Sequence, residues 1–190
     1  MDEPQTAAPG RTALRTAPVL REAARQRMVD ARFDFARFYT DHIASLTRFV
    51  MRLGATPYEA ADAAHTAFTE AFPQWAQIAS PGAWLRTVAA RCYLRQTGLR
   101  DRPVENLPDR PGGGCPVAAV VLKEEEERVY RALHLLPPKQ RQVMAWHLDG
   151  YSHAEIGRQL GMTAEAVRQN YARARSGLKR SLGLSKGEEE

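Results

Sequence analysis

The sequence predicts an all-α protein made of two small helical modules, joined by a flexible Pro/Gly linker, with a helix-turn-helix as the C-terminal module. Apolar residues recur at three- and four-residue steps in both halves of the chain, and no segment shows a convincing two-residue alternation of a β-strand. Residues 101–118 contain four prolines and three consecutive glycines, a composition typical of a linker. Residues 151–182 contain two short helical patterns separated by Gly161, Met162 and Thr163.

The first module is expected to contain three helices. The helical pattern begins near Phe33 and is broken at Gly54 and Pro57. The inward face of the second helix is predicted to carry Ala60, Ala64, Ala67, Phe68, Ala71, Phe72 and Trp75. The third begins near Ala83 and is predicted to turn Leu85, Val88, Ala89 and Cys92 inward. Residues 1–30, with three prolines among alanines and arginines, are expected to form a flexible extension whose helical part starts at about Val19.

The second module begins with an acidic helix start, which suits the positive end of a helix dipole. Pro137 and Pro138 end that helix and begin another, which stops at Asp149 and Gly150. The predicted organisation is an extension at 1–30, a first module at 31–100, a linker at 101–120, a second module at 121–183 and a disordered tail at 184–190.

Composition excludes several classes of protein. An apolar fraction of 44% is that of a globular domain, and no apolar run reaches the roughly 20 residues that span a bilayer. Cys92 and Cys115 form no CxxC pair, which fits a reducing cytoplasm. The five histidines lack metal-ligand spacing, and no phosphate loop or nucleophile motif is found, so we expect no metal, no cofactor and no enzyme.

Local signals in residues 151–182 agree on a tight helix-turn-helix. Ser152 and Glu155 form a capping box, and Thr163 is suited to cap the second helix. Gly157 allows a close approach, and Gly161 permits a left-handed turn. The predicted small core consists of Ile156, Leu160, Val167 and Tyr171. Such a motif lays its second helix in the major groove of DNA.

Charge supports this interpretation. Residues 139–182 carry eight basic and three acidic side chains, a net +5 equal to that of the whole chain. Residues near the start of the second helix are expected to reach base edges, namely Ala164, Glu165, Arg168, Gln169 and Asn170. Backbone phosphates are expected to pair with Arg173, Arg175 and Lys179. The alternative is a helical hairpin with a solvated basic face.

The chain resembles bacterial RNA polymerase sigma factors of the extracytoplasmic-function (ECF) subfamily from about Phe33 to Leu182. In the second module, "LPPKQRQV", "LDGYSHAEIGRQLGMT" and "AVRQNYARARSGLK" resemble region four, which recognises the −35 element. In the first, "FARFYTDHIASLTRFVMRL", "EAADAAHTAFTEAF" and "SPGAWLRTVAAR" resemble region two, which binds the polymerase clamp and melts the −10 element. The resemblance implies that the linker threads through polymerase and that no third domain lies between the modules.

The resemblance assigns further residues. Those implied to face the clamp of the largest polymerase subunit are Asp62, His65, Thr66, Thr69 and Glu70. Those implied to capture unstacked −10 bases, or to track their backbone, are Gln77, Ser80, Trp84, Arg86, Arg91 and Arg95. The clamp-facing helix departs from the family pattern at Ala61, His65 and Thr66, and the melting helix departs at Arg91 and Arg95. Trp75 and Trp84 fit a packed core as well as a base platform.

The chain is therefore expected to be a sigma factor, which binds the clamp and the flap of core RNA polymerase and directs promoter-specific initiation. Expected partners also include promoter DNA and an anti-sigma factor, with a cytoplasmic, nucleoid-associated location and no membrane insertion. The alternative is a stand-alone helix-turn-helix regulator that does not engage polymerase.

Overall fold

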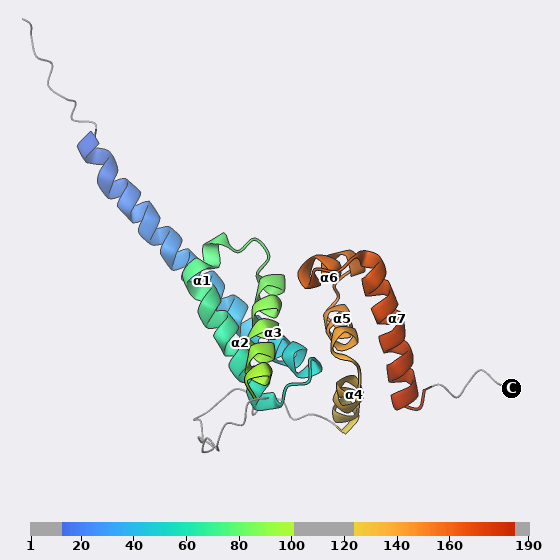
Figure 1. The fold of residues 1–190 in the computed structure, drawn as a ribbon. Coiled ribbons are helices and arrows are strands. Elements are labelled where there is room, and N and C mark those ends of the chain that lie inside the picture. The colour runs from blue at the N-terminus through green and yellow to red at the C-terminus, as the bar shows by residue number, and fades with distance from the viewer. Residues whose placement is uncertain (1–12, 101–123, 185–190) are drawn as a thin grey trace, which may run out of the picture. The chain divides into compact units, whose positions relative to one another are not determined.

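The computed structural model describes residues 13–100 and 124–184, which are helical throughout apart from short turns (Figure 1). The elements are α1 Ala13–Arg52, α2 Pro57–Ala71, the 3₁₀ helix η1 Phe72–Gln77, α3 Pro81–Arg100, α4 Glu124–His134, α5 Pro138–Leu148, α6 His153–Leu160 and α7 Ala164–Ser181. The all-α prediction is confirmed for these ranges. The predicted linker, Cys115 and all but the first residue of the predicted tail lie outside the described residues.

The chain divides by compactness into Met1–Thr40 and Asp41–Glu190. In the first of these units, α1 begins at Ala13, six residues before the predicted Val19. Sequence reasoning placed the start too late because it followed apolar periodicity, whereas this segment is rich in alanine and arginine, which favour helix without needing a buried face. Residues 1–12 of the predicted extension lie outside the described range.

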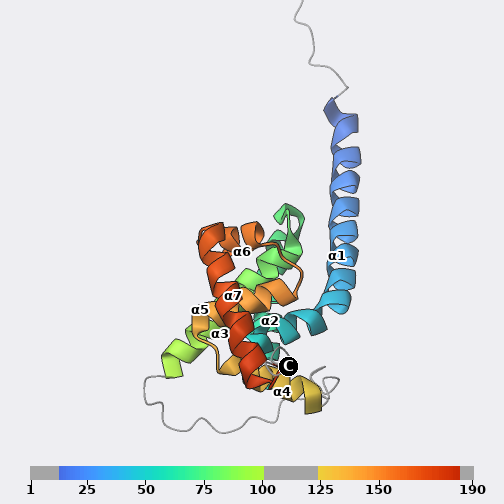
Figure 2. The same cartoon turned by 90° about the vertical axis from the view of Figure 1, so that its right-hand side faces the viewer.

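In the second unit, the three helices of the first module meet through small side chains. Figures 1 and 2 show α2 and α3 beside the C-terminal end of α1. The facing side of α2 is largely alanine and is completely buried at Ala60, Ala64, Ala67 and Ala71, as predicted. Leu85, Val88, Ala89 and Cys92 of α3 are buried opposite, also as predicted.

The end of α2 differs from its prediction. Phe72, expected on the inward face, is 47% exposed, and Trp75 is half-buried. The α-helix ends at Ala71 and continues as the tighter 3₁₀ turn η1, which has three residues per turn instead of 3.6. The change of pitch rotates Phe72 and Trp75 away from the face on which Ala67 and Ala71 lie.

The second module packs α7 against α5 and α6. Its core contains the buried residues Leu133, Leu136, Met144 and Ala174, covered by Tyr130, Tyr171 and Leu178. Trp146, Val143, Ile156 and Val167 are also fully buried. The helices begin and end as predicted, with four glutamates in the first turn of α4, Pro138 as the first residue of α5, and Asp149 just after its end.

The helix-turn-helix forms as its local signals predict. The Ser152 amide and hydroxyl donate to the Glu155 carboxylate at 2.8 and 2.6 Å, and the Glu155 amide donates back to the Ser152 hydroxyl at 3.3 Å. Gly161 takes the left-handed conformation, with φ 63° and ψ 36°. Thr163 accepts the Ala166 amide at 3.1 Å. Of the predicted core, Ile156 and Val167 are buried completely.

Two details of that prediction need correction. Leu160 and Tyr171 are only half-buried, so they border the small core. The close approach at Gly157 is to the turn itself: a Cβ there would lie 2.6 Å from the Met162 carbonyl oxygen. The absent side chain therefore sets the spacing between α6 and the turn that precedes α7.

Candidate nucleic-acid interface

Helix α7 is the most exposed basic helix of the second module. Val167 and Ala174 on its inner side are fully buried, which fixes the helix rotation and turns the remaining faces to solvent. The exposed side chains form two edges along the helix: Arg168, Arg175 and Lys179 on one, and Gln169, Arg173 and Arg180 on the other. This arrangement suits a helix that enters the major groove between two phosphate backbones.

The first turn of α7 carries a linked set of polar side chains. Glu165 forms an ion pair with Arg168 and accepts the Gln169 amide at 3.3 Å. The hydrogen bond and charge of Arg168 lower the pKa of Glu165, so its carboxylate stays ionised near neutral pH. One carboxylate thus binds both Arg168 and Gln169, the two side chains that are predicted to reach base edges.

Two other residues predicted to reach base edges, Ala164 and Asn170, are less available for contact with DNA. Ala164 is half-buried at the first position of α7. The Asn170 side-chain amide donates to the Ala166 carbonyl at 2.8 Å, within its own helix. This bond uses one of the two N–H groups of the amide and fixes the direction of the other.

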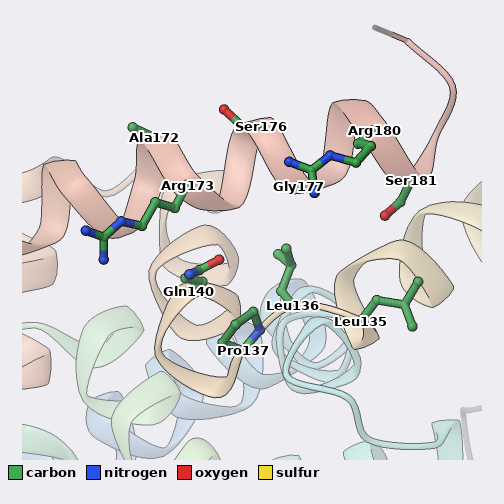
Figure 3. A pocket seen from close by; sticks show the side chains of 10 residues that line it. All are labelled: Leu135, Leu136, Pro137, Gln140, Ala172, Arg173, Ser176, Gly177, Arg180 and Ser181. Atoms are coloured by element: carbon green, nitrogen blue, oxygen red, sulfur yellow. The ribbon is translucent and has the colours of Figure 1, made fainter.

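The C-terminal half of α7 borders a groove of about 540 Å³ (Figure 3). Its opposite wall is the turn between α4 and α5, with Leu135, Leu136 and Pro137, and Gln140 lies above that turn. Arg173, which is predicted to bind a backbone phosphate, and Arg180 both line the groove. These two basic side chains therefore face the groove as well as solvent. Leu135 is 75% exposed at its rim and gives this end of the groove an apolar edge.

A second hollow, also of about 540 Å³, gathers four of the predicted −10 residues. It is lined by Gln77, Ser80, Trp84 and Arg91, which come from η1, the following loop and α3. Trp84 is half-buried and forms part of the wall of this hollow. Arg91 forms an ion pair with Glu70 at 2.9 Å. An aromatic wall flanked by amide, hydroxyl and guanidinium groups is suited to hold one unstacked base.

Arg86, which was also predicted to bind the −10 element, lies outside this hollow. Its guanidinium pairs with Asp149, which also pairs with Arg52, and all three side chains are largely buried. The Arg86 Cζ atom lies 5.5 Å from the ring centre of Tyr151 and 5.7 Å from that of Phe49. Arg86 is therefore held within the protein, while Arg95, which is exposed, lines an adjacent groove together with Arg91.

Comparison with known proteins identifies the family. The chain is 32% identical over 158 residues to the ECF RNA polymerase sigma factor SigM of Mycobacterium tuberculosis, in each of two strains, covering 80% of this chain and 79% of the relative. The chain belongs to the ECF sigma factors. Residues 126–178 match the family described as Sigma-70, region 4, a stretch that contains the helix-turn-helix.

Solved structures share the fold of this sigma factor. RpoE of Bartonella quintana, crystallised with the anti-sigma factor NepR, matches with a TM-score of 0.64 and 18% identity, over 80% of this chain and 99% of that one. CnrH, in complex with the cytosolic domain of CnrY, matches with a TM-score of 0.59 and 21% identity, over 84% of this chain and 96% of that one. The family resemblance and the function of directing transcription initiation are thus confirmed; sigma factors are not enzymes.

The five residues that the family resemblance predicts to face the polymerase clamp lie along one side of α2. Asp62 and Thr69 are exposed, whereas His65, Thr66 and Glu70 are half-buried. Asp62 accepts the Gln96 amide at 2.8 Å, and the Thr69 hydroxyl donates to the His65 carbonyl at 2.9 Å. Ala61, one of the departures from the family pattern, is only 3% exposed, so its small side chain serves packing and presents no surface to a partner.

Sequence reasoning missed three residues around these sites. Thr87 and Gln159 line the hollow around Trp84 and share a hydrogen bond of 2.9 Å. Thr87 could have been found, since it lies one turn from both Trp84 and Arg91 on the same helix. Gln159 and Asp149 carry no local signal, because their partners lie 72 and 63 positions away in the sequence.

No group of three or more metal-ligating side chains is found within residues 13–100 and 124–184. No helix in those ranges is both long enough and apolar enough to cross a membrane. Cys92 is a buried free thiol, and burial raises its pKa, which fits the predicted packing role.

Proposed function

We propose that this sigma factor recognises −35 duplex DNA through α7 and captures an unstacked −10 base in the hollow around Trp84. The observation that carries the proposal is the pair of exposed basic edges on α7, with Glu165, Arg168 and Gln169 linked at its N-terminal end. Arg168 and Gln169 have the donor patterns that suit guanine and adenine edges respectively. Arg173, Arg175 and Lys179 neutralise backbone phosphates on either side.

The −10 proposal is supported by the composition of the second hollow. A base that leaves the duplex stacks on the Trp84 indole, while Gln77 and Ser80 offer hydrogen bonds to its edge. Arg91 supplies charge for the backbone after releasing Glu70, and Arg95 extends that charge along α3. Arg86 contributes only where its pairing with Asp149 is broken.

Core polymerase binds two separate surfaces in this proposal. The clamp of the largest subunit contacts α2 along Asp62, His65, Thr66, Thr69 and Glu70. The flap occupies the groove of Figure 3, whose exposed Leu135 offers an apolar anchor beside Arg173 and Arg180. The site of action is the cytoplasm, where polymerase meets the nucleoid.

An anti-sigma factor is a further proposed partner. The two structural neighbours were solved as complexes, RpoE with the anti-sigma factor NepR and CnrH with the cytosolic domain of CnrY. We extend that property to this chain as a proposal, testable by co-purification from the native organism followed by reconstitution of the pair from separately purified proteins.

The first test is transcription in vitro. The purified chain is added to bacterial core polymerase with a genomic promoter library, and the transcript starts are sequenced. We expect new starts that share two spaced upstream elements and require the protein. No new starts, together with intact binding to duplex DNA, would favour the stand-alone regulator and would direct attention to His65 and Thr66, the two departures from the family pattern on the surface of α2.

The second test separates the two DNA roles on a promoter found by the first. Arg168→Ala should lose about 1–3 kcal/mol of discrimination at one −35 base pair. Trp84→Ala should leave closed-complex affinity intact and reduce the opening measured by permanganate footprinting. Arg131→Ala, an equal charge change on the exposed face of α4, is the matched control and should behave as wild type.

A further inference from the structure

Three aromatic side chains from three helices meet beneath the recognition helix. His147 lies in the last turn of α5, His153 is the first residue of α6, and Tyr171 is in the middle of α7. The Tyr171 ring centre lies 4.2 Å from that of His147 and 5.3 Å from that of His153, and the two imidazoles are 5.7 Å apart. Each of the helices α5, α6 and α7 thus contributes one ring to this histidine–tyrosine cluster.

Both histidines bury a ring nitrogen that has no hydrogen-bond partner. The atoms are Nδ1 of His147 and Nε2 of His153. A neutral imidazole can leave one nitrogen as an unprotonated acceptor, whose burial is tolerated more easily than that of a charged donor. Protonation would make both nitrogens of each ring donors, and an N–H would then be buried without an acceptor.

The charges around the cluster also oppose protonation. Burial, and then the nearby His153, lower the pKa of His147. His153 stands at the N-terminus of α6, the positive end of the helix dipole. The nearest carboxylates in sequence are engaged elsewhere: Asp149 pairs with two arginines, and Glu155 accepts from Ser152. From α7, the titratable group that faces the pair is the Tyr171 phenol.

Tyr171 connects the cluster to the position of α7. Its ring packs against the buried core of Leu133, Leu136, Met144 and Ala174. It lies within one turn of Arg168, on the inner side of the helix that carries the proposed base-reading residues. A charge introduced at the histidines therefore acts directly on the contact that holds α7 against α5 and α6.

We propose that His147, packed between His153 and Tyr171, is a positioning residue that makes the docking of α7 proton-sensitive, so that acidification loosens the recognition helix and weakens −35 recognition. This inference rests on the proposed role of α7. The docked helix requires the His147 ring to be neutral. Docking is complete above the ordinary histidine value of 6.5 and is weakened as the pH falls below it.

The test is hydrogen exchange of the α7 amides in the full chain, corrected for intrinsic rates, between about pH 7.5 and pH 5.5 in the presence of a chelator. One pH unit below the ordinary pKa, the equilibrium constant for opening should rise by up to about tenfold through His147. His147→Gln combined with His153→Gln should flatten this profile. His134→Gln, an exposed histidine of α4, is the matched control and should keep the wild-type profile.

A second measurement avoids dependence on the double variant. NMR titration of the His147 ring should give a pKa below 6.5, and His153→Gln should raise it. Equal acid profiles in wild type and the double variant, or a His147 pKa at or above 6.5, would overturn the inference. If the exchange profile depends on the histidines but no promoter-specific transcription occurs, the proposed function fails while the proton-sensitive docking stands.

Discussion

The turn of the helix-turn-helix allows a sharp comparison between two glycines. A Cβ added at Gly157 would lie 2.6 Å from the Met162 carbonyl oxygen and 3.8 Å from the Ala164 amide nitrogen, both backbone atoms. The Gly157 carbonyl also accepts the Met162 amide at 2.9 Å, so the same contact closes the turn. A Cβ added at Gly177, in the C-terminal half of α7, would meet only the Leu136 Cδ2 atom at 2.9 Å, the end of a rotatable side chain.

The expected magnitudes follow from these distances. Alanine is better than glycine in a helix interior by about 1 kcal/mol, and both substitutions gain this term. Overpacking against a fixed backbone costs about 1–3 kcal/mol, with contacts this short at the upper end. Gly157→Ala should therefore lower the free energy of unfolding by about 1–2 kcal/mol. Gly177→Ala should raise it by up to about 1 kcal/mol, because Leu136 can move aside and the helix gain remains.

The assay is urea unfolding of the full chain together with hydrogen exchange at α6 and α7. Gly157→Ala should also reduce −35-dependent transcription, since displacement of Met162 shifts the start of α7. Stability of Gly157→Ala equal to or greater than that of Gly177→Ala would refute the reasoning, because it would mean that the turn can move without cost.

Four further changes have expected outcomes. Gly161→Ala should destabilise the second module by about 1 kcal/mol in thermal melts, because φ of 63° is unfavourable for a residue with a Cβ. Ser152→Ala should cost about 1 kcal/mol by removing the cap of α6, detectable by circular dichroism as earlier melting. Asp149→Asn should cost about 2–3 kcal/mol in denaturant, since it leaves two largely buried arginines unpaired; an unchanged midpoint would argue that both reach solvent. The Ser152 hydroxyl lowers the pKa of Glu155, so this carboxylate contributes stability above its ordinary value of 4.5 that is lost as pH falls below it, and Glu155→Gln should reduce the acid dependence of melting.

The comparison of sequence and structure is clearest at the helix-turn-helix. The capping box at Ser152, the left-handed Gly161 and the cap at Thr163 were predicted and confirmed. Each depends on hydrogen bonds and backbone angles within four residues, which the local sequence specifies. The start of α1 was misjudged because helix propensity, without apolar periodicity, extends it to Ala13.

The structure brings together only some of the residues predicted to bind the −10 element. Gln77, Ser80, Trp84 and Arg91 share one hollow, but Arg86 pairs with a distant carboxylate instead. In the sequence, an arginine is described only by its charge and its helical spacing. These two signals do not distinguish an arginine on the surface from one that binds a buried partner. Which of them is held by a buried partner depends on chain segments that meet only after folding.

The sequence by itself determined most of the helices, the caps of α6 and α7, the turn before α7 and the family, because these depend on local pattern and on motifs in order. The tertiary structure alone decided that Asp149 binds Arg86, that Gln159 joins the hollow around Trp84, and that His147 meets His153 and Tyr171. These contacts join residues on different helices, and their energies come from burial and charge pairing that exist only once the helices are packed.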